Sequence, residues 1–256
     1  MPPSKHNIKL IIAYLGTPFV GWQKTPLGPT IEESLEIVLE QILQHPVQLQ
    51  AASRTDAGVH AQGQVVNFTT AKPICTQTLQ HSLNGMLPRE IAVLDAETVP
   101  EEFHPTLSCV KKKYEYQICY GASQLPFHRH TSWHFPCPLN LEQMRKAAEH
   151  LRGTHDFSSF CNERALWDRD PVCCIEGIEI FNACKERMHI QITGDHFLFR
   201  MARNIVGTLA YVGCGKIDAN QIPAILASQD RTLAGITAPA HGLTLKQVYY
   251  PHDLSQ

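Results

Sequence analysis

Strand-like and helix-like segments follow one another in this chain in one order that occurs twice. In the first half, residues 8–14 have the β-branched content typical of a strand. Residues 31–43 carry apolar side chains at helical spacing, and Thr30 with Glu33 matches a capping box at their start. The remaining elements are strands at 47–52 and 64–68, a helix at 76–84 and a strand at 91–99. The resulting order, β-α-β-β-α-β, is that of a split ferredoxin-like unit.

The second half shows the same order of elements without a clear sequence repeat. Its expected elements are a strand at 114–120, a helix at 141–151, strands at 174–181 and 188–193, helices at 201–212 and 221–227, and a strand at 246–250. Residues 100–105, with proline at both ends, form a semi-rigid connector. We therefore expect an α+β protein with domains 1–105 and 106–256. These would be two ferredoxin-like halves whose antiparallel sheets lie side by side, with an active-site cleft between them.

Composition limits the classes of function. A chain of 256 residues with 43% apolar residues can bury a sizeable core. Its formal net charge of −2 is unlike that of most nucleic-acid binders. An RNA-binding surface would therefore have to come from local clusters, such as Lys111 to Lys113 or Arg200 with Arg203.

Residues 1–7 lack the apolar run of a secretory signal, and no stretch is long enough to span a bilayer, so a cytoplasmic protein is expected. The nine cysteines include no Cys-x-x-Cys pair and are read as reduced packing residues. His128, His130 and His134 have an H-x-H-x-x-x-H spacing. No carboxylate lies close to them in the sequence, and ligand spacing alone is a weak signal, which favours surface histidines over a metal site.

A short turn between two expected strands carries Arg54, Thr55, Asp56 and Gly58. Loops held by strands often carry chemistry, and Gly58 permits backbone conformations that a side chain forbids. An Asp-x-Gly turn alone is explained as well by Asp56 bonding its own turn.

The wider sequence resembles the tRNA pseudouridine synthase A family in several segments that run in the family's order. These are Gly21-Trp22-Gln23, the string from Arg54 to Phe68, Lys112-Lys113-Tyr114-Glu115-Tyr116, the segment from Gly153 to Phe160, the segment from Phe199 to Gly207, and the exit from Thr237 to Leu243. Such a series in register is far more specific than any one of its members.

The resemblance implies a pseudouridine synthase fold and an isomerase acting on uridines at positions 38, 39 and 40 of the tRNA anticodon stem-loop. Asp56 corresponds to the family's essential aspartate and is the candidate nucleophile. A carboxylate could attack ribose C1′ or remove a proton from C2′, and the sequence leaves both routes open. The target uridine would have to be flipped out of its stem.

Other site residues are also implied by the resemblance. Arg203 would pair with Asp56, because a nearby cation favours the ionised carboxylate. Tyr114 would stack on the flipped uracil, and Leu243 would pack against it, although each could equally be a core residue. Arg54 would wedge into the RNA or contact a phosphate. The further RNA-binding candidates are Trp22, Gln23, Lys111, Lys112 and Arg200.

The reaction needs no nicotinamide, nucleotide or metal, and no Gly-rich phosphate loop is present in the sequence. The expected partners are tRNA and a second copy of the chain, with no membrane and no cofactor. Two alternatives remain open: a non-catalytic RNA-binding protein, and a hydrolase that uses two carboxylates. Retention of Asp56 weighs against the first alternative. The single strong carboxylate candidate weighs against the second.

Two positions depart from the family's pattern. Leu15 stands where an aspartate usually follows the first strand's tyrosine, and Cys173 stands where an arginine is common. We expect these changes to affect RNA docking, not catalysis.

Overall fold

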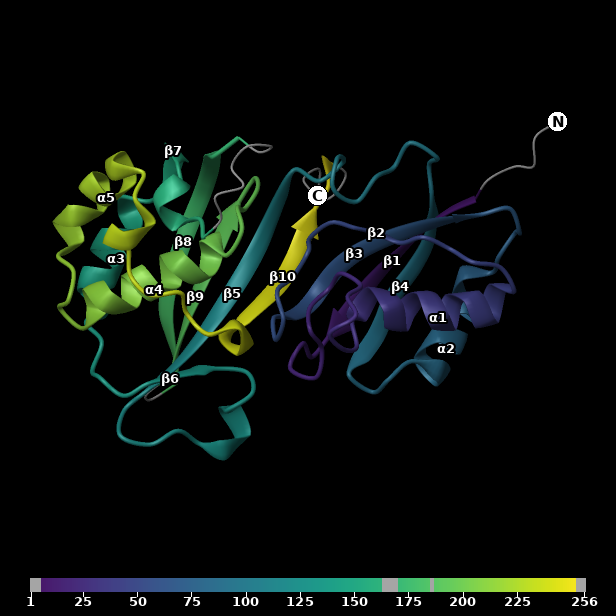
Figure 1. Cartoon of the computed structure of the whole chain (residues 1–256), viewed down its shortest axis with the longest axis horizontal. Helices are drawn as coiled ribbons and strands as arrows, with labels where there is room; N and C mark the ends of the chain where they lie inside the picture. The colour runs from purple at the N-terminus through teal and green to yellow at the C-terminus, as the bar shows by residue number, and fades with distance from the viewer. Residues whose placement is uncertain (1–5, 163–169, 185–186, 252–256) are drawn as a thin grey trace. The chain divides into compact units, whose positions relative to one another are not determined.

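A computed structural model describes residues 6–162, 170–184 and 187–251 (Figure 1). Residues 1–5, which entered the expectation of no secretory signal, lie outside the described residues. The chain divides into two compact units, Met1–Val110 with Leu245–Gln256 and Lys111–Thr244. The predicted boundary at residue 105 stays a prediction.

Unit 1 contains the first predicted β-α-β-β-α-β series. Its elements are β1 (His6–Tyr14), α1 (Ile31–Leu43), β2 (Gln50–Ala51), β3 (His60–Thr70), α2 (Thr76–Met86) and β4 (Ile91–Val99). The strand β10 (Leu243–Tyr249) returns from the end of the chain to this sheet, whose order is β4-β1-β3-β10 with β2 paired to β3. The pairs β1–β3, β1–β4 and β2–β3 are antiparallel, as the ferredoxin-like prediction requires.

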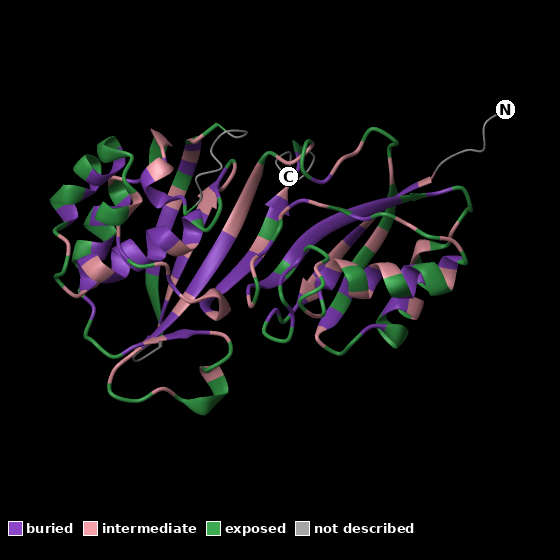
Figure 2. Ribbon diagram, in the orientation of Figure 1, coloured by how far each residue is buried: buried purple, intermediate pink, exposed green. Residues whose placement is uncertain are grey.

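Alternation along β1 explains the core of this unit. Ile8, Leu10 and Ile12 are fully buried, whereas Lys9 and Ile11 on the other face are only half-buried. The helix α1 adds its apolar stripe, including Leu35 and Leu39, to the buried face. Figure 2 shows the same pattern, with buried strands and helices whose outer faces are exposed.

Unit 2 begins with β5 (Lys111–Tyr120), and its main strands have the order β5-β9-β8-β7. The strands are β7 (Gly153–Asp156), β8 (Val172–Cys184) and β9 (Arg187–Gly194), and each adjacent pair is antiparallel. The helices are α3 (Leu141–Glu149), α4 (Met201–Gly213) and α5 (Ile222–Ser228). Both units therefore confirm the predicted α+β class with antiparallel sheets.

The predicted helix starts are confirmed in atomic detail. The Thr30 hydroxyl accepts from the Glu33 amide at 3.2 Å, and the Asn140 side chain accepts from the Gln143 amide at 3.1 Å. Each cap satisfies an amide that the first helical turn leaves without an intrahelical partner.

Some strands differ from their predicted bounds. β2 has only two residues, because the amide of Leu49 just before it donates to Glu36 Oε1 and not to a neighbouring strand. β6 (Trp133–Phe135) was not among the expected elements, yet it pairs in parallel with the end of β5. Three residues are too few to show a period in the sequence.

Candidate active site

The Asp56 turn in unit 1 has the geometry expected of an Asp-x-Gly turn. The Val59 amide donates to the Asp56 carbonyl at 3.1 Å, and Gly58 has φ +81°. That value lies in the left-handed region, which glycine adopts without steric cost. Asp56 is half-buried, while Arg54 and Ala57 are exposed. Asp56 is therefore partly exposed on a turn whose backbone is hydrogen-bonded.

A set of buried, hydrogen-bonded polar side chains supports this turn. The Tyr14 hydroxyl and Thr55 Oγ1 are 2.8 Å apart, and Gln64 Nε2 donates to Tyr14 at 3.4 Å. Gln64 also donates to the Ser53 carbonyl at 2.6 Å. Gln64 is fully buried. Tyr14 of β1 thus holds Thr55, the residue next to Asp56, and Gln64 of β3 holds both Tyr14 and Ser53.

Trp22 supports the same turn through its backbone and its indole. Its amide donates to the Thr55 carbonyl at 3.0 Å, and its ring lies 6.4 Å from the Tyr14 ring. The side chain was predicted to contact RNA, but it is only 2% exposed and belongs to the core. Gln23, the next residue, is exposed.

In unit 2, α4 carries Arg203 and fixes part of its side chain. Arg203 Nε donates to the Ala238 carbonyl at 2.8 Å, and the Ala238 amide donates back to the Arg203 carbonyl at 3.1 Å. This reciprocal pair joins α4 to the segment that leads into β10. The guanidinium is half-buried.

Tyr114 and Tyr116 lie on the same face of β5, opposite Ile192 and Ile190 of β9. The Tyr114 ring is 7% exposed and packs edge-on against Phe197 at 4.8 Å. Tyr116 is fully buried. Its hydroxyl donates to the Pro239 carbonyl at 2.7 Å, and burial raises the pKa of this phenol well above its usual value.

The remaining predicted residues of unit 2 have mixed surroundings. Leu243 is buried at the start of β10. Lys111 forms an ion pair with Glu176 at 2.9 Å, and both Lys111 and Lys112 are half-buried. Arg200 is exposed, has φ +60°, and places its guanidinium 4.7 Å from the centre of the Phe199 ring.

Sequence reasoning missed the buried polar residue that follows Arg203. Asn204 is 0% exposed, and its amide binds four partners from segments 160–162 and 231–237. A polar residue on the buried face of an apolar helix was the available signal. Its partners could not be inferred, because they lie up to 44 residues away in sequence.

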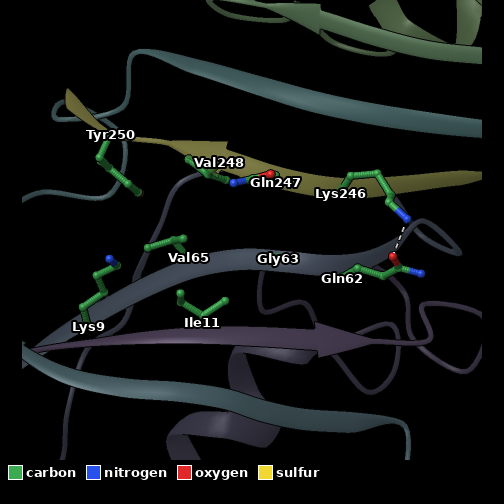
Figure 3. Close-up of a pocket in the computed structure, with 9 residues that line it drawn as sticks. All are labelled: Lys9, Ile11, Gln62, Gly63, Val65, Lys246, Gln247, Val248 and Tyr250. Atoms are coloured by element: carbon green, nitrogen blue, oxygen red, sulfur yellow. Dashed lines mark hydrogen bonds between the residues drawn. The ribbon is translucent and has the colours of Figure 1, made fainter. Parts of the chain in front are cut away.

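A hollow of about 280 Å³ lies on the sheet of unit 1, on the face that carries Lys9 and Ile11 (Figure 3). Lys246 donates to Gln62 at one end of this hollow. At the other end Lys9 forms an ion pair with Glu97 at 2.7 Å and lies above the Tyr250 ring. Both lysines thus already have acceptors in unit 1.

The histidines weighed as metal ligands have separate partners. His128 Nε2 lies 3.2 Å from Arg187 Nη1, and His134 Nε2 lies 3.0 Å from the Gly121 carbonyl. His130 accepts from Arg129 at 2.9 Å. Within residues 6–162, 170–184 and 187–251, no group of three or more His, Cys, Asp or Glu side chains could hold a metal ion. Among the helices within these residues, none is long and apolar enough to cross a membrane.

The two departures from the family pattern lie in different environments. Leu15 is half exposed, and its amide donates to the Glu90 carbonyl. Cys173 is fully buried with Sγ 3.2 Å from His196 Nε2, and burial raises the pKa of the thiol to about 12. Cys173 is therefore a neutral packing residue at neutral pH.

Comparison with known proteins gives a consistent family. Residues 10–106 and 147–251 match the family described as tRNA pseudouridine synthase. The match includes Asp56 and Arg203, whereas Tyr114, Lys111 and Lys112 fall in the gap between the two matched segments.

Full-length relatives agree with this match. The chain is 53% identical over 249 residues to tRNA pseudouridine synthase A 2 of Protochlamydia amoebophila, with 96% of this chain and 95% of the relative covered. It is 41% identical over 252 residues to tRNA pseudouridine synthase A of Thermoanaerobacter sp., with 95% and 99% covered. A chain in a crystal structure of a Cbf5-Nop10-Gar1 complex aligns with 93% of this chain and 48% of its own length. Its TM-score of 0.42 and identity of 12% are too low to carry an argument. The extent of the family match and the identities to these relatives show that the chain belongs to the tRNA pseudouridine synthase family.

Proposed function

We propose that this protein isomerises uridine to pseudouridine at positions 38, 39 and 40 in the anticodon stem-loop of tRNA, with Asp56 as the nucleophile. The observation that carries the proposal is the family match over residues 10–106 and 147–251, which includes the Asp56 turn. The geometry of that turn supports it, because a half-buried carboxylate on a fixed turn can meet a substrate without moving the backbone.

The reaction exchanges one bond to the ribose for another. The bond between uracil N1 and ribose C1′ breaks, the freed uracil rotates, and C5 bonds to C1′ while the C5 proton leaves and N1 gains a proton. Oxidation states balance without an external electron carrier. Asp56 either attacks C1′ and is later displaced, or removes the C2′ proton and returns it. Both routes need the ionised carboxylate.

Residues of unit 2 have supporting roles in this proposal. Arg203 supplies the cation that stabilises the Asp56 carboxylate, and a guanidinium fork suits a carboxylate geometrically. Tyr114 provides an aromatic face for the flipped uracil, worth about 1–3 kcal/mol in stacking. Leu243 adds apolar contact to the same base. No cofactor is required.

The partners follow from the substrate. The RNA contacts we propose are made by Arg54, Gln23, Lys111, Lys112 and Arg200. The burial of Trp22 gives its side chain a supporting role instead. We also propose a homodimer acting on tRNA in the cytoplasm.

Release of tritium from tRNA that carries C5-tritiated uridine tests the function against its alternatives. Isomerisation releases the label as water and leaves a modified nucleotide in intact tRNA. A non-catalytic RNA-binding protein would bind the tRNA and release no tritium. A glycoside hydrolase would instead produce free uracil and an abasic site, and either of these results would contradict the proposal.

A further inference from the structure

A saturated polar network in unit 2 surrounds the residue that follows Arg203. The Asn204 amide nitrogen donates to the Phe160 carbonyl and to Asn162 Oδ1, both at 2.6 Å. Its Oδ1 accepts from Arg231 Nη2 at 2.8 Å and from Thr237 Oγ1 at 2.7 Å. A side-chain amide has two donor hydrogens and two acceptor sites, so every one is in use. In this network the orientation of Asn204 is fixed.

Arg231 connects Asn204 to the chain that leads into β10. Besides Asn204, its Nη2 donates to Thr237 Oγ1 at 3.1 Å, and its Nη1 donates to the Gly235 carbonyl at 2.8 Å. The guanidinium is half-buried, and its planar fork holds these acceptors in one arrangement. Its hydrogen bonds therefore join Arg231 to Gly235 and Thr237 within segment 231–238, and to Asn204 on α4.

The same segment packs directly against the backbone of α4, which it follows closely in Figure 1. The Gly235 amide donates to Thr208 Oγ1 at 2.9 Å. A Cβ added at Gly207 would overlap the Ile236 carbonyl, so only glycine allows this approach. The segment has little freedom to slide along the helix.

The fixed position of segment 231–238 determines the position of a hydrogen-bond acceptor of Arg203. Its Nε donates to the carbonyl of Ala238, at the end of the fixed segment, and the Ala238 amide donates back to its carbonyl. The next carbonyl, that of Pro239, accepts from the Tyr116 hydroxyl on β5. A displacement of the segment would thus move the group that orients the Arg203 guanidinium.

From this geometry we infer that Arg231 and Asn204 are positioning residues that set the orientation of Arg203 through segment 231–238. The inference rests on the proposed function for its catalytic consequence but not for its structural one. Because a misplacement of about 1 Å can cost up to roughly 100-fold in rate, their loss reduces kcat and leaves the KM for tRNA nearly unchanged.

The test compares Arg231→Met with Arg145→Met. Arg145 also donates two hydrogen bonds to a carbonyl within unit 2, that of Ile180, so it is a matched control for losing a packed arginine. The first readout is hydrogen exchange at the Nε–H of Arg203, followed by ¹⁵N NMR and assigned with Arg203→Lys. The second is kcat and KM for pseudouridine formation, corrected for the folded fraction.

We expect exchange at Arg203 Nε to be about 10-fold faster in Arg231→Met, which corresponds to about 1.4 kcal/mol, and unchanged in Arg145→Met. We expect kcat to fall about 10- to 100-fold in the first variant only. Unchanged exchange, or an equal fall of kcat in both variants, would overturn the inference. If the wild-type protein forms no pseudouridine, the proposed function fails, and the exchange measurement still decides the positioning.

A milder pair covers the case in which Arg231→Met does not fold. Thr237→Val removes one donor to Asn204 Oδ1, and Thr237→Ser keeps it. The inference predicts faster exchange at Arg203 and lower kcat for the valine variant, with both restored by serine. Identical behaviour of the two variants would contradict it.

Discussion

Replacing Tyr14 with phenylalanine should impair catalysis more than its cost in stability explains. The change removes the hydroxyl that lies 2.8 Å from Thr55 Oγ1 and 3.4 Å from Gln64 Nε2. The ring and its packing against Trp22 remain. A buried hydrogen-bonding group left without its partner costs about 1–3 kcal/mol.

Two quantities follow from that loss. For a chain of this size the melting temperature should fall by about 2–4 °C per kcal/mol. Because Thr55 directly precedes Asp56, the turn also gains freedom, and kcat should fall by more than about 10-fold with little change in the Kd for tRNA. Differential scanning calorimetry gives the first quantity, and tritium release under saturating tRNA gives the second.

Tyr250→Phe is the matched control in the same unit. Its buried hydroxyl donates to the Pro105 carbonyl at 2.9 Å, so this variant loses a comparable hydrogen bond away from the Asp56 turn. It should show a similar fall in melting temperature with kcat close to wild type. If both variants lose kcat to the same extent, the hydroxyl of Tyr14 stabilises the unit generally and does not hold the turn.

Three further predictions address unit 2. Tyr114→Phe should keep tRNA binding, and Tyr114→Ala should lose turnover; full activity of both variants would place the uracil elsewhere. Replacing Lys111 and Lys112 with glutamine should weaken tRNA binding and lower the slope of log K against log salt by about 0.9 per lost phosphate contact, and an unchanged slope would remove them from the RNA surface. Because burial raises the pKa of Tyr116, whose hydroxyl binds the Pro239 carbonyl, the unfolded state releases that proton first as pH rises above about 10. The free energy of unfolding should therefore decline in that range, and Tyr116→Phe should show a shallower decline in urea titrations at pH 9 to 11.

Much of the fold could be predicted because local patterns and caps agree with it. The apolar stripe of residues 31–43 and the cap at Thr30 each point to α1 without tertiary information. The parallel strand β6 could not be found in this way. It has only three residues, and it forms a strand because it pairs with the end of β5, a segment that is not adjacent to it in the sequence.

The parts of the candidate site that depend on a local motif could be predicted from the sequence. The parts that depend on whether a side chain is buried in the folded protein could not. The Asp56 turn follows from its own residues and Gly58. The burial of Trp22 does not, because an aromatic residue in a loop motif can face either the core or the RNA. The hydrogen bond between Arg231 and Asn204 joins residues 27 apart in sequence, and only folding brings them together.

In the proposed reaction the Asp56 carboxylate performs the chemistry on a bound tRNA. Asp56→Asn keeps the size and the turn but removes the negative charge, so a single-turnover reaction with enzyme in excess tests it most directly. For this variant we expect tRNA binding close to wild type, because phosphate contacts carry most of the affinity, and no pseudouridine in the anticodon stem-loop. Formation of pseudouridine by the asparagine variant at a rate near that of wild type would contradict the assignment of Asp56 as the catalytic residue.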